Sequence, residues 1–516
     1  MRAPESFYSP ADWLVFAAYL VVVLGVVAIL RKRTNPRTGG VPWPVVGFSL
    51  AAAEVSGLGL VAIPGLLLSI HGNLAYLQWI LGAVVARFFL TFWMRRVAGG
   101  STEEPSPSRR GSWILIPAEI LVLSARTMVA ALPLHWMTPL PFAWCLLFVF
   151  ALVGLCLVAG KHTKTVVWCE AGQLLVIFAL LALVLVRIVG KLQGGWDGWI
   201  ASSASAEDYA GTVSDKWVCF DFRTDPSLEF TFWTALLAYP FLQCQLFLAD
   251  RGMRSRLETC SNKNAAIKAL WWSLAGQIFT VILALIGMAL YVHYRQFPIT
   301  DPSLLRAVAW GAGEPGRPDT VFWLWVLTET GTGLKGALLG AFLMAGVSGL
   351  HGQLLGWNDV DVKTTAGEGP DKTTSSAPLA RRFLLLALAS IAALGVERFY
   401  LAGGEGLLEF VYGLLAYVTG PLLAFALVKE SDPSRFRKGG LIVGILLTWA
   451  LTASVRRDHS LVSERFLHHA ESPEIGDEYD RNKGIRSSAK LASPWLWPAG
   501  TILSGLFAWG FRRKTG

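Results

Sequence analysis

Residues 45–70 read VVGFSLAAAEVSGLGLVAIPGLLLSI, an apolar stretch that carries one carboxylate and several residues that disfavour a continuous helix. Glu54 lies near its middle, and two glycines and the pair Pro64 and Gly65 follow it. A charge at bilayer depth costs roughly 2.5–3.5 kcal/mol on insertion scales. Backbone groups freed by a break are tolerated there only where protein or a water-filled cavity satisfies them. The stretch therefore predicts an interrupted helix that lines a substrate or ion site.

Composition assigns the chain to a broad class. Of its 516 residues 53% are hydrophobic and 16% charged, and the mean hydropathy is +0.49. This is too little polar surface to cover a soluble globule of that size. Apolar runs able to cross about 30 Å of hydrocarbon predict an all-α polytopic membrane protein with about thirteen transmembrane helices. The runs lie at 11–30, 42–70, 74–97, 112–136, 141–160, 164–189, 228–250, 266–294, 334–356, 380–402, 404–429, 437–456 and 493–512.

The distribution of Lys and Arg predicts the orientation. Arg31, Lys32 and Arg33 follow the first span directly, which places that end in the cytoplasm and the N-terminus outside. Basic clusters after the third, fifth, seventh, eleventh and thirteenth spans then all fall inside, and so does the C-terminus. Most of the net charge of +9 comes from these basic residues on the inner side, so the charge does not indicate a nucleic-acid partner. We expect a multi-pass protein of the cell (inner) membrane.

A second apolar run is also interrupted. Residues 232–250 read FWTALLAYPFLQCQLFLAD, and Pro240 in the middle removes a helical hydrogen bond. Two broken segments about five spans apart predict inverted repeats with a binding site between them at the membrane midplane. The expected parts are an extra N-terminal helix in 1–41, repeat one in 42–189, an outer loop at 190–227, repeat two in 228–429, and two C-terminal helices in 430–516 with an outer loop at 457–492.

Six motifs occur in the order found in one known family. They are VGFSLAAAEVSGLGLVAIPGLLLSIHG at 46–72, VVWCEAGQ at 166–173, DRGMRSR at 250–256, GLKGALLGAFLMAGVSGLHGQLL at 333–355, YVTGPLLAFALVKE at 417–430 and PWLWPAGTILSGLFAWG at 494–510. On these motifs the chain resembles the sodium:solute symporters of the sodium/glucose and sodium/proline type, almost from end to end. The resemblance implies a five-plus-five inverted-repeat core of the leucine-transporter type that works by alternating access.

The resemblance also implies a sodium site, with Na⁺ as the coupling ion. In the family, oxygens of the first and eighth core helices bind this ion. The corresponding groups here are the carbonyls of Ala52 and Val55, the carbonyl of Ala345 and the hydroxyl of Ser348. The next position, usually Ser or Thr in the family, is Gly349, so one oxygen ligand is missing.

Glu54 stands where the family usually has an uncharged residue that contacts the substrate. Its carboxylate can supply a cation ligand, titrate as a proton carrier or meet a cationic group of the substrate. Alternatively it pairs with a basic or hydroxyl neighbour across the bundle. The other candidate substrate-binding residues are Ser56, Tyr239, Gln243, Gln245 and Phe247. At the positions that match 245–247 the sugar-transporting relatives have a gating Tyr-Tyr-Trp, whereas this chain has Gln245, Leu246 and Phe247. The substrate of those relatives therefore cannot be inferred for this chain.

Other intramembrane charges have two interpretations. Glu170 replaces the Asp of the family's V-V-W-T-D, a position that resembles a way-station on the path of the leaving ion. Alternatively it only favours the positive end of its helix dipole and the nearby lysines. Glu119 and Arg126, seven residues apart on one helix face, are expected to neutralise neighbours within the bundle, and so is Arg87.

Common catalytic motifs do not occur: the sequence has no nucleotide-binding glycine loop, H-E-x-x-H, paired-Cys motif or G-x-S-x-G, so we expect no enzyme. The sequence predicts a secondary active transporter that couples a small polar organic solute to an ion, Na⁺, across the lipid bilayer. One alternative is a proton-coupled or uncoupled transporter of the same fold that uses Glu54. A further alternative is a solute sensor that does not transport, although no output domain follows the last span.

Overall fold

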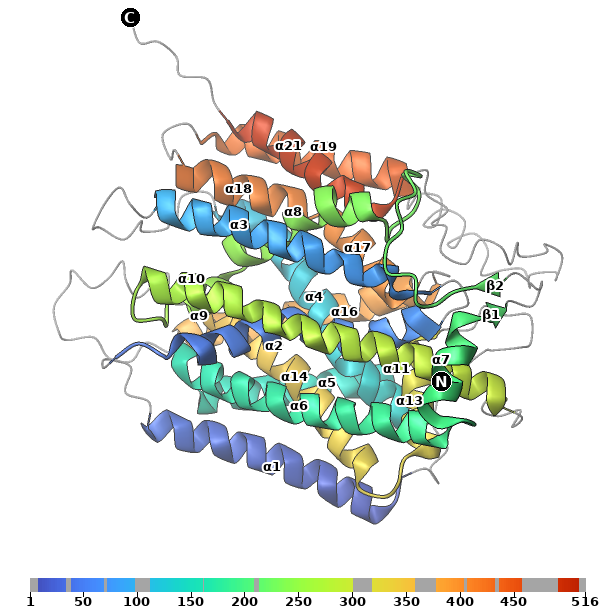
Figure 1. The fold of residues 1–516 in the computed structure, drawn as a ribbon. Coiled ribbons are helices and arrows are strands. Elements are labelled where there is room, and N and C mark those ends of the chain that lie inside the picture. The colour runs from blue at the N-terminus through green and yellow to red at the C-terminus, as the bar shows by residue number, and fades with distance from the viewer. Residues whose placement is uncertain are drawn as a thin grey trace, which may run out of the picture.

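The computed structural model describes residues 8–33, 39–68, 72–97, 112–160, 162–207, 213–299, 318–357, 377–402, 406–431, 436–456 and 491–509. These residues form a bundle of helices that run back and forth along one common direction (Figure 1). In this part of the chain the only strands are the antiparallel pair β1 (Ala206–Glu207) and β2 (Val213–Ser214). The expected outer loop at 457–492 lies almost entirely outside the described residues.

The α-helices are α1 (Pro10–Arg33), α2 (Trp43–Leu68), α3 (Trp79–Val97), α4 (Ile116–Met137), α5 (Phe142–Ala159), α6 (Thr163–Lys191), α7 (Gly195–Ala204), α8 (Tyr239–Leu248), α9 (Arg251–Leu257), α10 (Lys263–Trp272), α11 (Gln277–Gln296), α13 (Val321–Glu329), α14 (Leu334–Leu355), α16 (Ala377–Ala402), α17 (Leu407–Ala416), α18 (Thr419–Ser431), α19 (Lys438–Arg456) and α21 (Leu496–Ala508). Short 3-10 turns are η2 (Leu74–Gln78), η3 (Ser112–Leu115), η5 (Ser273–Gly276), η6 (Pro318–Thr320) and η9 (Ser493–Trp495), and η4 (Thr234–Ala238) is a π-helical turn.

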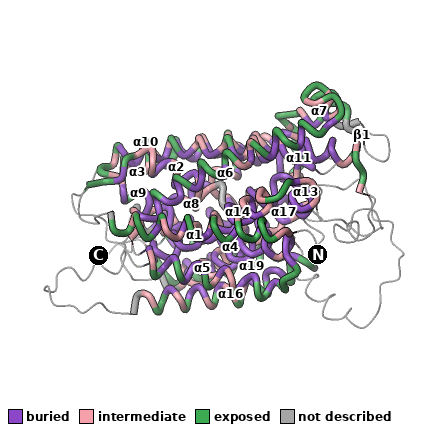
Figure 2. Tube along the Cα trace, turned by 90° about the horizontal axis from the view of Figure 1, so that it is seen from below, coloured by how far each residue is buried: buried purple, intermediate pink, exposed green. Residues whose placement is uncertain are grey.

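The helices have the length and surface of membrane spans. Among the described residues nine are long and apolar enough to cross a bilayer, and two bent pairs raise the number to eleven. The two other predicted spans coincide with shorter helices, Thr234–Leu248 and α21. Figure 2 shows exposed residues along the outside of the bundle, where Leu14 is 70% and Leu506 69% exposed. Such apolar outer faces are stable against lipid, so the chain is a multi-pass membrane protein.

The first predicted interruption is present in α2. Its two halves, Trp43–Glu54 and Gly57–Leu68, meet at an angle of 56°. The bend therefore directly follows Glu54. In the second half, Gly65 lets η6 approach closely, because a Cβ there would lie 2.7 Å from the backbone of Asp319.

The second predicted interruption is present as well. The chain forms the π-helical turn η4 and changes to the α-helix α8 at Tyr239 and Pro240. Proline has no amide hydrogen, so the regular hydrogen-bond pattern cannot pass through it. Helix α3 packs tightly against this turn, since a Cβ at Gly82 would lie 2.1 Å from the carbonyl oxygen of Ala235.

A third bend was not predicted. The expected span 404–429 consists of α17 and α18, which meet at 44°. Pro421 in the first turn of α18 cannot donate to the carbonyl of Tyr417. The indole nitrogen of Trp449 donates to that carbonyl instead, at 2.9 Å, so the backbone group freed by the bend is satisfied by α19.

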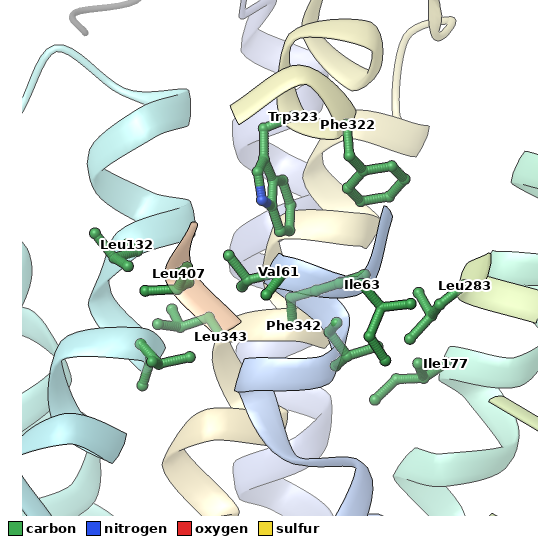
Figure 3. Close-up of a cluster of buried hydrophobic side chains, with 14 of the residues drawn as sticks. Val61, Ile63, Leu132, Ile177, Leu283, Phe322, Trp323, Phe342, Leu343 and Leu407 are labelled. Atoms are coloured by element: carbon green, nitrogen blue, oxygen red, sulfur yellow. The ribbon is translucent and has the colours of Figure 1, made fainter. Parts of the chain in front are cut away.

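Packing around the second half of α2, Gly57–Leu68, forms the largest apolar core of the described residues. Figure 3 shows Val61 and Ile63 of α2 among side chains of α4, α6, α11, α13, α14 and α17. Phe322, Trp323 and Phe342 are each at most 2% exposed. This core holds the second half of α2 in place, because moving that helix would open cavities in a close-packed cluster and so cost free energy.

Helix α1 fixes the beginning of α14. Asp12 accepts a hydrogen bond from the amide of Gly333 at 2.6 Å. It also accepts hydrogen bonds from the amide and hydroxyl of Ser9 at the start of α1. The two backbones nearly touch, since a Cβ at Gly336 would lie 2.0 Å from the carbonyl oxygen of Asp12. Because α14 carries Ala345 and Ser348, α1 contributes to positioning the predicted sodium ligands.

The ends of α1 and α3 and the beginnings of α6 and α10 lie at one end of the bundle, on the left in Figure 1. Arg31 donates to the carbonyl of Val158 at 3.5 Å. Lys164 donates to the carbonyl of Gly39 at 2.7 Å, and Lys263 to that of Arg95 at 2.9 Å. These described basic groups thus share one end of the bundle, and the assignment of that end to the cytoplasm stays a prediction.

Candidate functional site

A cavity of about 180 Å³ lies between the two interrupted helices. Four of the predicted substrate-binding residues line it, namely Glu54 of α2 and Tyr239, Gln243 and Gln245 of α8. Phe247 does not line it and is buried behind Arg87 instead. Ser56 lies at the bend of α2, and its side chain is outside the described part of the structure. Further walls come from α4, α11, α14 and α17.

Glu54 pairs with a basic neighbour. One of its oxygens, Oε1, accepts a hydrogen bond from the guanidinium of Arg87, which is fully buried in α3. Arg87 also donates to Gln243 Oε1 at 2.6 Å and to Ser273 Oγ at 3.0 Å. Of the interpretations open from the sequence, the ion pair across the bundle is therefore the one this structure contains.

The second oxygen of Glu54 remains available. Oε2 is buried and has no hydrogen-bond partner among the described residues, while Glu54 itself lines the cavity. Nearby, Gln243 Nε2 donates to the hydroxyl of Tyr239 at 2.7 Å, which leaves that hydroxyl's own hydrogen for another acceptor. An unpaired buried acceptor is costly, so a hydrogen-bond donor that reached Oε2 would be bound favourably.

Arg126 of α4 is a cation on the cavity wall. It donates to Gln353 Oε1 at 2.9 Å and lies 3.1 Å from Asp250 Oδ2. The Arg126 side chain is 28% exposed, compared with 4% for Glu54, 4% for Asp250 and 2% for Arg256. Among these charged cavity residues, Arg126 is the one a bound anion can reach.

Aromatic side chains form part of the cavity wall. Tyr76, Trp79, Tyr239 and Tyr412 line it, and Trp497 of α21 packs against Trp79. The Trp79 ring lies 4.4 Å from Tyr239 and 5.0 Å from Tyr412, centroid to centroid. Rings at such distances add favourable contact beyond their buried area. Tyr76, Trp79, Tyr239, Tyr412 and Trp497 therefore form one aromatic cluster at the cavity wall.

A recess of about 20 Å³ adjoins the cavity on the α14 side. That volume suits one water-sized particle. Three of the four predicted sodium ligands line it, namely Ala52, Ala345 and Ser348, and Val55 lies at the bend of α2. Ser348 Oγ lies 3.1 Å from both Gln173 Oε1 and the carbonyl of Ala345. Hydroxyl, amide and carbonyl oxygens are hard donors that suit Na⁺ in type, and Gly349 adds no side-chain oxygen to them.

Glu170 also lines this recess and forms a buried ion pair. Arg256 donates to Glu170 through Nε at 2.8 Å and through Nη2 at 2.5 Å, and Ser49 Oγ adds a third bond at 2.5 Å. Both charged side chains are 2% exposed. Of the two nearby lysines, the described one, Lys164, points to Gly39 instead, so Glu170 is held by Arg256 at the predicted ion path.

The other intramembrane charges are neutralised as expected. Glu119 pairs with Arg251 at 3.2 Å, and Arg126 pairs with Asp250. From the sequence, Arg87 and Arg126 were expected only to neutralise other charges. In the structure Arg126 lines the cavity, and Arg87 lies behind its wall against Glu54. The signal for them was available, since an ionisable residue inside a span is by default a candidate for function.

Lys216 ties the loop after α7 to the end of α2. This fully buried amine donates to the carbonyls of Leu67 at 3.0 Å and Gly72 at 2.8 Å, and lies 4.1 Å from the centre of the Tyr291 ring. Burial lowers the pKa of Lys216 from 10.5 to about 7. The carbonyls and the ring favour the charged amine and oppose that shift.

We expect Lys216 to make the stability of the protein depend on pH. With a folded pKa below the unfolded one, the unfolded chain binds more protons between pH 7 and 10.5, so stability rises with pH in this window. The slope is at most about 1.4 kcal/mol per pH unit. The contribution of Lys216 is measured by thermal unfolding of the wild type and of Lys216→Met from pH 7 to 9. It is the difference between the two proteins in how stability changes with pH. Parallel curves would contradict the depressed pKa.

Comparison with known proteins agrees with this architecture. The sequence matches no family model. It is 22% identical over 462 residues to the sodium/sialic acid symporter SiaT of Proteus mirabilis (strain HI4320), with 85% of this chain and 88% of the relative covered. The structure is similar to a Na⁺-coupled sialic acid symporter solved in a substrate-bound outward-open state, with a TM-score of 0.67, 16% identity, and 97% of this chain and 96% of that chain covered.

The structural similarity establishes the fold. An all-α polytopic chain superimposes on a sodium-coupled symporter over nearly its full length. The predicted fold class, a multi-pass helical protein with a core of the leucine-transporter type, is therefore confirmed.

Proposed function

We propose that the chain is a member of the sodium:solute symporter family that couples the entry of a small polar organic solute to Na⁺ by alternating access. One observation carries this proposal. The solute-sized cavity and the ion-sized recess share Ala52, Ala345 and Gly349 as wall residues, so they adjoin each other at α2 and α14. The sequence and structural similarities to sodium-coupled symporters support the same conclusion.

The shared wall supplies a mechanism for coupling. An ion held by oxygens of Ala52, Val55, Ala345 and Ser348 would bind α2 to α14. Solute in the cavity contacts α2, α4 and α8, so each ligand would stabilise the arrangement that the other needs. A ligand shifts a conformational equilibrium only by its difference in affinity for the two states. On release, the ion would pass Glu170, whose pair with Arg256 stands beside the recess.

The cavity also favours one class of solute. Arg126 is the partly exposed cation on the wall, and Glu54 Oε2 is an unpaired acceptor. A solute with both a carboxylate and hydroxyl groups would satisfy each. The relative named above is a symporter of sialic acid, which combines these groups. We therefore propose a sugar-acid-like solute, contacted by Glu54, Ser56, Tyr239, Gln243 and Gln245.

The organisation and orientation predicted from the sequence complete the proposal. Repeat one would comprise residues 42–189 and repeat two 228–429, with one helix before and two after them. The N-terminus would lie outside and the C-terminus inside the cell membrane. Accessibility labelling of single cysteines introduced at Arg31 and at Ser227 would test the orientation.

Sodium-driven uptake into proteoliposomes tests the function. We expect an inward Na⁺ gradient to drive accumulation of a radiolabelled sialic acid or a related sugar acid, and an equal K⁺ gradient to drive none. The membrane potential adds about 2.3 kcal/mol per charge per 100 mV. Uptake driven by a pH gradient without Na⁺ would instead support proton coupling, and binding without uptake would support a sensor.

Restoring the missing ligand should strengthen the dependence on sodium. Gly349→Ser adds a hydroxyl beside Ser348, and the space is open, because no atom of the described neighbouring segments lies within 4 Å of a Cβ at Gly349. We expect the Na⁺ concentration for half-maximal uptake to fall about tenfold, equivalent to about 1.4 kcal/mol. Gly349→Ala fills the same space without an oxygen and is the matched control. Equal behaviour of the two variants would contradict the mapped sodium site.

A further inference from the structure

Arg87 has the surroundings of a bound cation. Its guanidinium is completely buried, and three oxygens accept its hydrogen bonds. They are Glu54 Oε1, Gln243 Oε1 at 2.6 Å and Ser273 Oγ at 3.0 Å. The Phe247 ring lies 4.5 Å from the central carbon of the guanidinium and adds a cation–π contact.

These three acceptors come from three different segments. Glu54 is at the bend of α2, Gln243 is in α8 just after the second interruption, and Ser273 begins η5. Arg87 itself belongs to α3, so one side chain connects the two interrupted helices through their oxygens. A carboxylate, an amide and a hydroxyl oxygen form a donor set that would suit a hard monovalent cation.

The arrangement also limits what Glu54 can do. Its oxygen Oε1 already has the guanidinium of Arg87 as partner, and the guanidinium is a cation that belongs to the protein. Oε2 has no partner among the described residues. Arg87 Nε has no partner in the described part of the chain, so the guanidinium is not saturated by a second acid.

We propose that Arg87 is a built-in cation that joins the two interrupted helices at Glu54, where a second coupling ion would otherwise be needed. The charge at this position stays with the protein throughout the cycle. Only the ion in the recess near Ser348 would then cross the membrane with the solute. The inference rests on the proposed transport function only for this last statement.

The decisive test removes the built-in cation and supplies one from solution. Arg87→Ala leaves the oxygens of Glu54, Gln243 and Ser273 facing the vacated volume. We expect methylguanidinium, and Na⁺ or K⁺ at higher concentration, to raise the thermal midpoint of this variant saturably, by about 2 °C or more. Choline chloride keeps the ionic strength constant. Wild-type protein, with the position filled, should show no methylguanidinium effect.

A double variant provides the matched control. Glu54→Gln/Arg87→Ala has the same vacated volume without the carboxylate, so we expect it to lose the methylguanidinium response. The proposal is overturned if Arg87→Ala responds no more than the wild type, or if the double variant responds equally. Binding is measured here without transport, so a wild type that fails to take up solute would remove the proposed function and leave this result standing.

A second measurement applies where Arg87→Ala does not fold. Arg87→Lys keeps the charge, and Glu54→Gln/Arg87→Gln is a neutral pair of similar size. In uptake assays we expect the lysine variant to keep the wild-type number of Na⁺ ions per solute and the neutral pair to lose at least about 30-fold in rate. A neutral pair that transports like the wild type would show that the charge has no part in the cycle.

Discussion

Replacing Arg256 with alanine is expected to lower the free energy of unfolding by about 3–5 kcal/mol. The reason is the state in which Glu170 would be left. In the wild type this buried carboxylate receives two hydrogen bonds from Arg256 and one from Ser49. Without the guanidinium it keeps only the serine hydroxyl and carries an uncompensated charge. The loss is measured by thermal or denaturant unfolding of the purified protein.

Two controls separate this effect from the loss of any arginine. Arg251→Ala breaks the pair of Arg251 and Glu119, whose two side chains are 19% and 13% exposed. Because this pair is more exposed, the loss of unfolding free energy should be clearly smaller. The double variant Glu170→Gln/Arg256→Gln should recover most of the stability, because no unpaired charge remains. Equal losses for Arg256→Ala and Arg251→Ala, or no recovery in the double variant, would contradict the importance of this buried pair.

Replacing Arg126 with alanine is expected to weaken uptake of a carboxylate solute by roughly 30- to 700-fold. This corresponds to about 2–4 kcal/mol for losing the charged partner of a desolvated anion. Some loss of stability should accompany the change, because Asp250 loses its ion-pair partner. Asp250 still accepts a hydrogen bond from the amide of Met253 at 3.0 Å as the N-cap of α9, where the helix dipole favours a carboxylate. The ratio kcat/KM for uptake gives the effect, and the thermal midpoint reports the fold.

The nature of the solute provides the control for this prediction. An uncharged analogue in which the carboxylate is an amide should lose little between wild type and Arg126→Ala. Arg126→Lys should fall between the two, since lysine keeps the charge without the planar fork that matches a carboxylate. A similar loss for the acid and the amide would mean that Arg126 acts through packing rather than on the anionic group.

The cavity shows how far local sequence signals reach. The predicted substrate-binding residues Glu54, Tyr239, Gln243 and Gln245 line it, and each lies near an interruption that the sequence itself encodes. Phe247 was included by motif position alone, and it faces Arg87 instead. A helix position says little about which way a side chain points until the neighbouring helices are known.

The bend between α17 and α18 was missed for a related reason. Thr419, Gly420 and Pro421 carry the signal, yet a proline in an apolar run is compatible with a straight span when neighbours satisfy the freed carbonyl. Here Trp449 satisfies it from α19. Helix α21 also packs closely, since a Cβ at Gly420 would lie 2.4 Å from the backbone of Gly500. The bend is therefore fixed by packing against α19 and α21.

The membrane class, the two interrupted helices and the order of the spans could all be read from the amino-acid sequence. These follow from composition and from Gly, Pro and charge within short stretches, whose physical effects are local. Which charges meet depends instead on how the helices pack together. Glu54 pairs with Arg87, 33 residues away in the sequence, and Glu170 with Arg256, 86 residues away. The free energy of a buried charge depends on the group that packing brings against it, and packing is decided only by the tertiary structure.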